Sequence, residues 1–117
     1  MNPATNLGPL VTASHRARVV SYIEKGKKEG AKLEFGGDTP DLAGAYVNPT
    51  LFTGVNNRMT IAQEEIFGPV ASAIEVNGIK EALSIANDSI YGLAASVWTR
   101  DLNVALKTVR DLEAGVI

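Results

Sequence analysis

Cysteine is absent from the 117 residues, which excludes disulfides, thiolate metal sites and a cysteine nucleophile within this chain. The sequence has one histidine, His15, so no ligand spacing indicates a metal site. It has no apolar run near the roughly 20 residues of a membrane span. The net charge of -2 is too small to favour nucleic acid or an anionic membrane. We therefore expect no metal, no nucleic acid and no membrane among its partners.

The two ends of the chain carry few signals. The first six residues have neither the basic nor the apolar region of a secretory signal. Together with the missing cysteine this is compatible with a reducing compartment, and we expect a cytoplasmic protein. The chain stops at 115–117, where a strand begins, whereas domains usually end in a polar tail. That ending suggests a truncated chain or an incomplete open reading frame.

A helix is predicted to begin at Thr12, whose side chain can cap it. Along one face of this helix lie Val19, Tyr22, Ile23 and Gly26. Residue 30 is a glycine, which is typical of the position after a helix end. The length is that of one domain.

Short strands are predicted where polar and apolar residues alternate or where an apolar run lies between turns. They cover residues 31–35, 46–55, 70–76, 93–99 and a beginning at 116–117. Two helices separate the last three, one near Ile79 with Asn77 as its cap and one from Leu102. This alternation favours parallel strands with crossover helices, which is an α/β fold. Trp98 is expected in the core. A parallel sheet needs helices on both faces, so three helices are expected to leave part of this sheet uncovered.

The most distinctive stretch covers residues 60–70, where Glu64 and Glu65 precede a Gly68-Pro69 turn. One interpretation is a loop with solvated acids and Phe67 as a core anchor. The other is functional, because a carboxylate can accept hydrogen bonds from two vicinal hydroxyls, one on each oxygen. The residues alone leave both interpretations open.

The run Glu64-Glu65-Ile66-Phe67-Gly68-Pro69-Val70 resembles the E-E-x-F-G-P-V signature of the aldehyde dehydrogenase superfamily. Other motifs match the family in order and spacing along the whole chain. They are Asn2-Pro3, Gly8-Pro9-Leu10, Glu29-Gly30-Ala31-Lys32-Leu33, Gly36-Gly37, Asn48-Pro49-Thr50-Leu51-Phe52, Ala86-Asn87-Asp88-Ser89, Tyr91-Gly92-Leu93-Ala94-Ala95, Trp98-Thr99-Arg100-Asp101-Leu102 and Leu112-Glu113-Ala114-Gly115. The resemblance points to the C-terminal part of the catalytic domain.

The resemblance implies cofactor contacts in this chain. Glu65 would bind the ribose hydroxyls next to the nicotinamide of NAD or NADP, and Phe67 would contact its nicotinamide side. The first predicted helix would bring His15 and Arg18 near the cofactor. The alternative for His15 is a solvated side chain in the first turn of a helix. Glu64 is interpreted as structural or solvated.

The family's chemistry needs a cysteine nucleophile and a glutamate base, and the family places both upstream of Asn2-Pro3. The resemblance therefore implies no catalytic residue in this chain. It implies a partial three-layer α/β catalytic-domain fold over 1–117, a single incomplete domain of an enzyme that oxidises an aldehyde to a carboxylic acid. The isolated chain is expected to be inactive and to bind NAD weakly or not at all.

The incompletely covered sheet predicts self-association of the isolated chain. Two alternatives to an enzyme piece remain. One is a stand-alone, non-catalytic interaction module derived from the same fold. The other is an unrelated α/β binding domain, which would require all the ordered motif matches to be coincidental.

Overall fold

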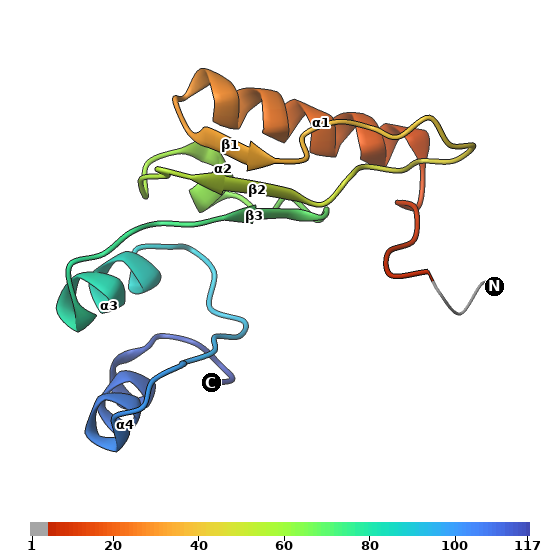
Figure 1. Ribbon diagram of the computed structural model, residues 1–117. Coiled ribbons are helices and arrows are strands. Elements are labelled where there is room, and N and C mark those ends of the chain that lie inside the picture. Colours follow the sequence, from red (N-terminus) through yellow and green to blue (C-terminus); the bar gives the residue numbers. More distant parts are fainter. Residues whose placement is uncertain (1–4) are drawn as a thin grey trace. The chain divides into compact units, whose positions relative to one another are not determined.

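The computed structural model describes residues 5–117, so the Asn2-Pro3 motif lies outside the described residues. The chain forms two compact units, residues 1–74 and 75–117. Figure 1 shows the elements in chain order. The first unit holds α1 (Ala13–Lys28), β1 (Lys32–Phe35), β2 (Thr50–Thr53), α2 (Thr60–Gln63) and β3 (Val70–Ser72). The second holds α3 (Ile79–Asn87) and α4 (Leu102–Asp111).

Helix α1 confirms the prediction from its sequence pattern. The Thr12 side chain caps it by accepting a hydrogen bond from the backbone N–H of His15 at 3.1 Å. Its inner face buries the four residues that the helical spacing selects, namely Val19, Tyr22, Ile23 and Gly26. Three lysines in the last turn favour the helix electrostatically, because that end carries a partial negative charge.

The sheet of the first unit is mixed, with the order β1-β2-β3. Strand β2 pairs with β3 in parallel, but β1 pairs with β2 antiparallel. The prediction of mostly parallel strands is therefore wrong for β1. The reason lies in the connections, because a parallel pair needs a crossover element and only the β2–β3 connection contains a helix, α2. The third strand is also shorter than the predicted 70–76.

The core of the first unit lies between α1 and one face of this sheet (Figure 1). Gly26 of α1 has no side chain, and the side chains of Phe52 and Ile61 pack against its backbone. The opposite face of the sheet lines an open pocket with Phe35, which is 55% exposed. The buried apolar residues are Val19, Tyr22, Ile23, Ala31, Val47, Phe52, Val55, Met59, Ile61 and Ile66.

The second unit departs further from the sequence prediction. Of the predicted strands 93–99 and 116–117, the structure forms one isolated parallel bridge between Ala94 and Val116. Trp98 is 94% exposed, so its predicted place in the core is wrong. A strand is held by hydrogen bonds from a neighbour, and the short 116–117 segment can pair with only the beginning of 93–99.

The helices of the second unit begin differently from one another. Gly78 occupies the N-cap of α3, so the predicted cap Asn77 is wrong by one residue. Asn77 instead donates hydrogen bonds to the Glu81 carboxylate from its backbone and its side chain. The Asp101 side chain caps α4 by accepting from two backbone N–H groups.

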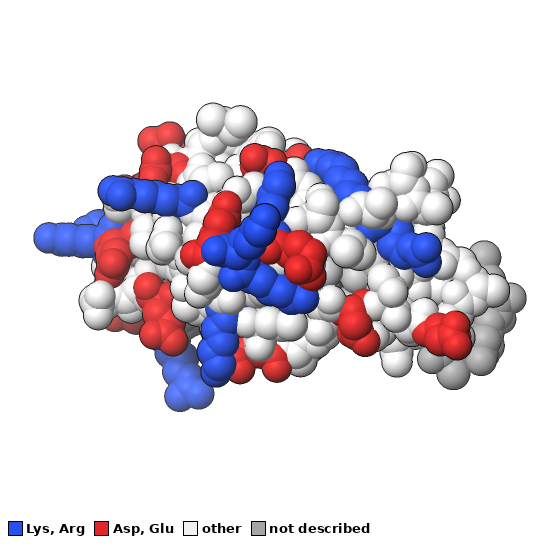
Figure 2. Space-filling model, turned by 90° about the horizontal axis from the view of Figure 1, so that it is seen from above, with Lys and Arg blue, Asp and Glu red and all other residues white. Residues whose placement is uncertain are grey.

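Positively and negatively charged side chains are mixed over the face shown in Figure 2. Among the described residues, no helix combines the length and the apolar character needed to cross a membrane.

Candidate functional site

The four predicted cofactor residues come from two segments far apart in the sequence. His15 and Arg18 lie on α1, and Glu65 and Phe67 lie in the segment between α2 and β3. His15 Nε2 lies 2.6 Å from the carbonyl oxygen of Phe67, and Arg18 Nη2 donates to the carbonyl oxygen of Glu65 at 3.0 Å. The structure thus brings all four residues together at one place in the first unit.

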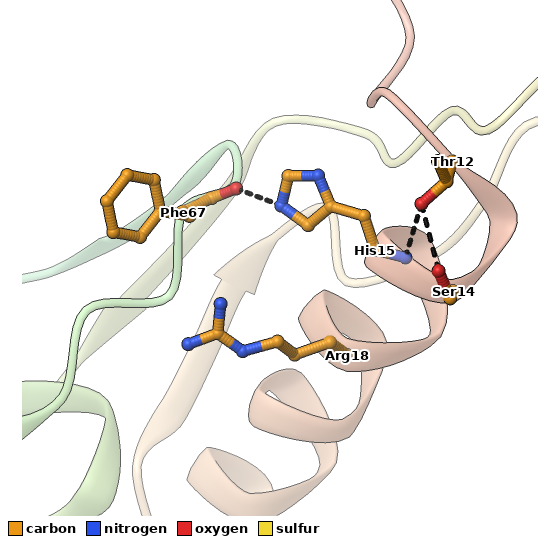
Figure 3. A pocket seen from close by; sticks show the side chains of 5 residues that line it. All are labelled: Thr12, Ser14, His15, Arg18 and Phe67. Atoms are coloured by element: carbon orange, nitrogen blue, oxygen red, sulfur yellow. Dashed lines mark hydrogen bonds between the residues drawn. The ribbon is translucent and has the colours of Figure 1, made fainter.

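A shallow surface pocket lies at this junction. Its volume is about 610 Å³, and it is lined by Thr12, Ser14, His15, Arg18 and Phe67. Figure 3 shows the His15 and Arg18 side chains extending from α1 toward the Phe67 segment, with the Phe67 ring turned away from His15. The pocket therefore combines two nitrogen-bearing side chains, two hydroxyls and one aromatic ring.

The Glu65 side chain is exposed and is not among the residues that line this pocket. Its backbone carbonyl is held by Arg18, while no described residue bonds its carboxylate. A carboxylate in that state can accept hydrogen bonds from both hydroxyls of a ribose. The Glu65 carboxylate could therefore bind sugar hydroxyls without first breaking a hydrogen bond within the protein.

The backbone around Phe67 has an unusual conformation. Phe67 has φ +54°, and it is the one non-glycine residue with a positive φ among the described residues. Such a conformation is strained for a side chain with a Cβ atom, and strained residues cluster at functional sites. Its ring is 66% exposed, whereas the preceding Ile66 is only 8% exposed and anchors the segment in the core. The functional interpretation of Phe67, rather than the core anchor, fits this geometry.

Gly68 fixes how closely the segment approaches α1. A Cβ atom at Gly68 would lie 2.6 Å and 2.7 Å from the two methyl groups of Val19. Only a residue without a side chain allows this contact, since overpacking a buried position is destabilising. The close approach sets the distance at which His15 and Arg18 reach the carbonyl groups of the same segment.

Sequence reasoning missed the contribution of Tyr22, which it placed only in the core. The Tyr22 hydroxyl donates to Glu64 Oε2 at 2.6 Å, so the exposed Glu64 side chain is tied to α1. Two cations flank the Tyr22 ring, Arg18 at 5.4 Å and Lys25 at 4.9 Å from its centroid. A signal was present, because a buried tyrosine on an apolar helix face needs a partner for its hydroxyl.

The chain is similar to known proteins along its whole length. The model of the aldehyde dehydrogenase family matches residues 1–117. The chain belongs to the aldehyde dehydrogenase family. Betaine aldehyde dehydrogenase of Mesorhizobium japonicum is 47% identical over 119 residues, which cover 98% of this chain and 24% of that protein. The chain thus spans about a quarter of the length of this relative.

Solved aldehyde dehydrogenases contain the same fold. The NAD+ complex of the Mycobacterium tuberculosis aldehyde dehydrogenase matches with a TM-score of 0.95 and 47% identity, over 98% of this chain and 24% of that one. An indole-3-acetaldehyde dehydrogenase complexed with NAD+ matches with a TM-score of 0.95 and 52% identity, over 97% of this chain and 23% of that one. The mixed sheet and its helices therefore correspond to part of an aldehyde dehydrogenase.

Proposed function

We propose that this chain is the C-terminal part of the catalytic domain of an NAD(P)-dependent aldehyde dehydrogenase, which oxidises an aldehyde to a carboxylic acid. Its contribution is the group of contacts at the nicotinamide half of the cofactor. The observation that carries this proposal is the packing of residues 64–68 on α1, with Glu65 and Phe67 facing outward beside His15 and Arg18. The similar solved structures include several NAD+ complexes.

Each proposed residue has a role suited to its chemistry. The Glu65 carboxylate accepts hydrogen bonds from the ribose hydroxyls, and the exposed Phe67 ring contacts the nicotinamide side. His15 and Arg18 face the cofactor from the first turns of α1 while holding the opposite segment through its carbonyl groups. When bound, NAD or NADP supplies the acceptor for the hydride that the aldehyde loses.

The catalytic groups of the parent enzyme are proposed to lie outside this chain. The sequence has no cysteine, so it offers no thiolate to attack an aldehyde carbonyl. On this proposal residues 1–117 form one incomplete domain of a three-layer fold. The isolated chain is then inactive and binds NAD weakly, because it lacks the contacts to the adenine and pyrophosphate groups.

Calorimetric titration of the purified chain with NAD tests the cofactor role. We expect weak binding at millimolar NAD, and this binding should be reduced in Glu65→Ala. Propanal and betaine aldehyde are the substrates for the accompanying assay, in which we expect no NADH formation. Turnover by the purified chain would show that the proposed division of catalytic groups is wrong.

Self-association of the isolated chain is a further part of the proposal. Apolar side chains stand exposed on both units, among them Phe35 at 55% and Trp98 at 94%. Exposed apolar surface and open strand edges promote association. Light scattering that gives the mass of a stable monomer would contradict this expectation.

The alternative function is a stand-alone interaction module that kept the fold without the chemistry. The same exposed apolar side chains are the observation that favours it. The coding sequence separates the two functions. An upstream continuation that encodes the cysteine motif supports the enzyme, whereas start and stop signals at the ends of the 117 codons support the module.

A further inference from the structure

The segment 64–68 is attached to α1 at successive positions along the helix. His15 contacts the carbonyl of residue 67, Arg18 binds the carbonyl of residue 65, and Tyr22 binds the side chain of residue 64. The three helix residues are three and four positions apart, so they share one face. Since the helix numbers rise as the segment numbers fall, the segment runs antiparallel to α1 along that face.

The Tyr22 contact differs from the other two. Tyr22 is 7% exposed, and its bond to Glu64 joins two side chains in a partly buried place at 2.6 Å. A hydroxyl that donates to a carboxylate makes a charge-assisted hydrogen bond, which is stronger than a bond between neutral groups. The contacts of His15 and Arg18 to backbone carbonyls are solvent-exposed. Tyr22 therefore makes the best-protected polar contact between the helix and the segment.

This contact also fixes which of the two adjacent acids points toward α1. Glu64 has φ −120° and ψ 145°, which is extended backbone. Successive side chains on extended backbone point to opposite sides. Because the Glu64 side chain points toward Tyr22, the Glu65 side chain points the other way, and its carboxylate has no bond to any described residue, although both glutamates are exposed.

We propose that Tyr22 is a positioning residue for the cofactor contacts. By holding the Glu64 carboxylate against α1, its hydroxyl leaves the Glu65 carboxylate pointing away from the helix and keeps the segment, including the strained Phe67 backbone, in one conformation. This inference rests on the proposed function, since that function makes Glu65 and Phe67 the cofactor contacts. It adds Glu64 and Tyr22 to the site as residues that act through Glu65.

Amide hydrogen exchange of the full chain, followed by NMR, tests the proposal without cofactor. The backbone N–H groups of Glu64 and Val70 flank the segment and donate to Thr60 and Gly68, so both report on its opening. In Tyr22→Phe we expect about tenfold faster exchange at these two amides, the effect of losing one hydrogen bond to a charged group. The amide of Ala31, bonded to Gly26 at the far end of α1, should keep its wild-type rate.

Three variants complete the comparison. Glu64→Ala removes the acceptor without touching the buried ring and should match Tyr22→Phe. Glu64→Gln keeps an acceptor oxygen and should restore slow exchange. Tyr46→Phe is the matched control, because Tyr46 lies in the same unit and no described residue bonds its hydroxyl. Wild-type exchange at Glu64 and Val70 in both Tyr22→Phe and Glu64→Ala would overturn the proposal, and so would equal acceleration at Ala31.

Titration of the wild-type chain with NAD separates this inference from the proposed function. Chemical-shift changes at the Glu65 and Phe67 amides support the function. Their absence at millimolar NAD would count against the cofactor role, whereas the exchange rates alone decide whether Tyr22 positions the segment.

Discussion

The two units of the chain bury very different numbers of residues. Among the described residues, all ten buried apolar side chains belong to the first unit, where α1 covers one face of a three-stranded sheet. In residues 75–117 the only buried residue is Thr108, and α3 buries none. Burial of apolar surface is the main source of folding free energy. The first unit therefore has the means to fold by itself, whereas the second exposes the apolar faces of helices that other surfaces would have to cover.

The largest expected effect comes from the centre of the first core. Phe52 is fully buried, and Phe52→Ala should lower the free energy of unfolding by about 3–5 kcal/mol. The matched aromatic of the second unit is Trp98, which is 94% exposed, and Trp98→Ala should change it by less than about 0.5 kcal/mol. Urea denaturation followed by circular dichroism measures both. Equal losses would break the comparison between the units.

A smaller effect on stability is expected at Gly36, where two backbone segments of the first unit approach closely. Gly36 has φ +74°, and a Cβ atom there would lie 2.0 Å from the carbonyl oxygen of Pro49. Gly36→Ala should therefore lower stability by about 2–4 kcal/mol. Gly54 also has a positive φ, +60°, but faces open space, so Gly54→Ala should cost only about 1 kcal/mol. A denaturation midpoint equally low for both variants would show that close packing at Gly36 contributes nothing.

The helix caps extend the comparison of the two units, because removing each cap should lower stability by about 1 kcal/mol. Thr12→Ala should shift the unfolding midpoint of the whole first unit, because α1 contributes to its core. Asp101→Ala should instead loosen α4 alone, with exchange of its amides about fivefold faster and the first unit unchanged. Amide exchange by NMR distinguishes the two. Loss of protection in the first unit upon Asp101→Ala would mean that the units are energetically coupled.

The smallest effect concerns an exposed ion pair on the sheet. The hydrogen bond from Lys32, followed by that from Thr53, holds the pKa of Glu34 below its ordinary value of 4.5. The folded state thus favours the carboxylate. Its contribution to stability is present above pH 4.5 and is lost as the pH falls through the lowered pKa.

Urea midpoints between pH 7 and pH 3 check this expectation. The loss of stability over this range should be slightly smaller in Lys32→Met than in the wild-type chain, because exposed ion pairs contribute little. Lys107→Met, a control in the second unit, should leave the pH dependence unchanged. The same pH dependence in wild type and Lys32→Met would show that the pair does not stabilise the fold.

The sequence predicted elements well where their pattern is local. The cap at Thr12 and the helical spacing of Val19, Tyr22 and Ile23 are complete within α1, and the structure confirms them. The direction of β1 was wrong, because it depends on whether a connection contains a crossover helix. The strand predicted at 93–99 reduced to one bridge and left Trp98 exposed, since a strand also depends on its neighbours.

The candidate site, too, could be predicted only in part from the sequence. The four cofactor candidates were selected by the family resemblance and not by the spacing of apolar residues. The structure places them side by side; they are His15, Arg18, Glu65 and Phe67. Their cofactor role stays a prediction. The position of Tyr22 on an apolar helix face indicates that its hydroxyl needs a partner, but the partner Glu64 lies 42 positions away, so no local pattern could identify it.

The central claim is that the first unit carries preformed contacts for the nicotinamide half of NAD. Titration of isotope-labelled chain with NAD, followed by NMR, tests it most directly. The account predicts shifts that grow steadily with NAD, confined to the amides of α1 and of residues 64–68, and reduced in Glu65→Ala. Unchanged spectra at millimolar NAD, or shifts confined to residues 75–117, would contradict it.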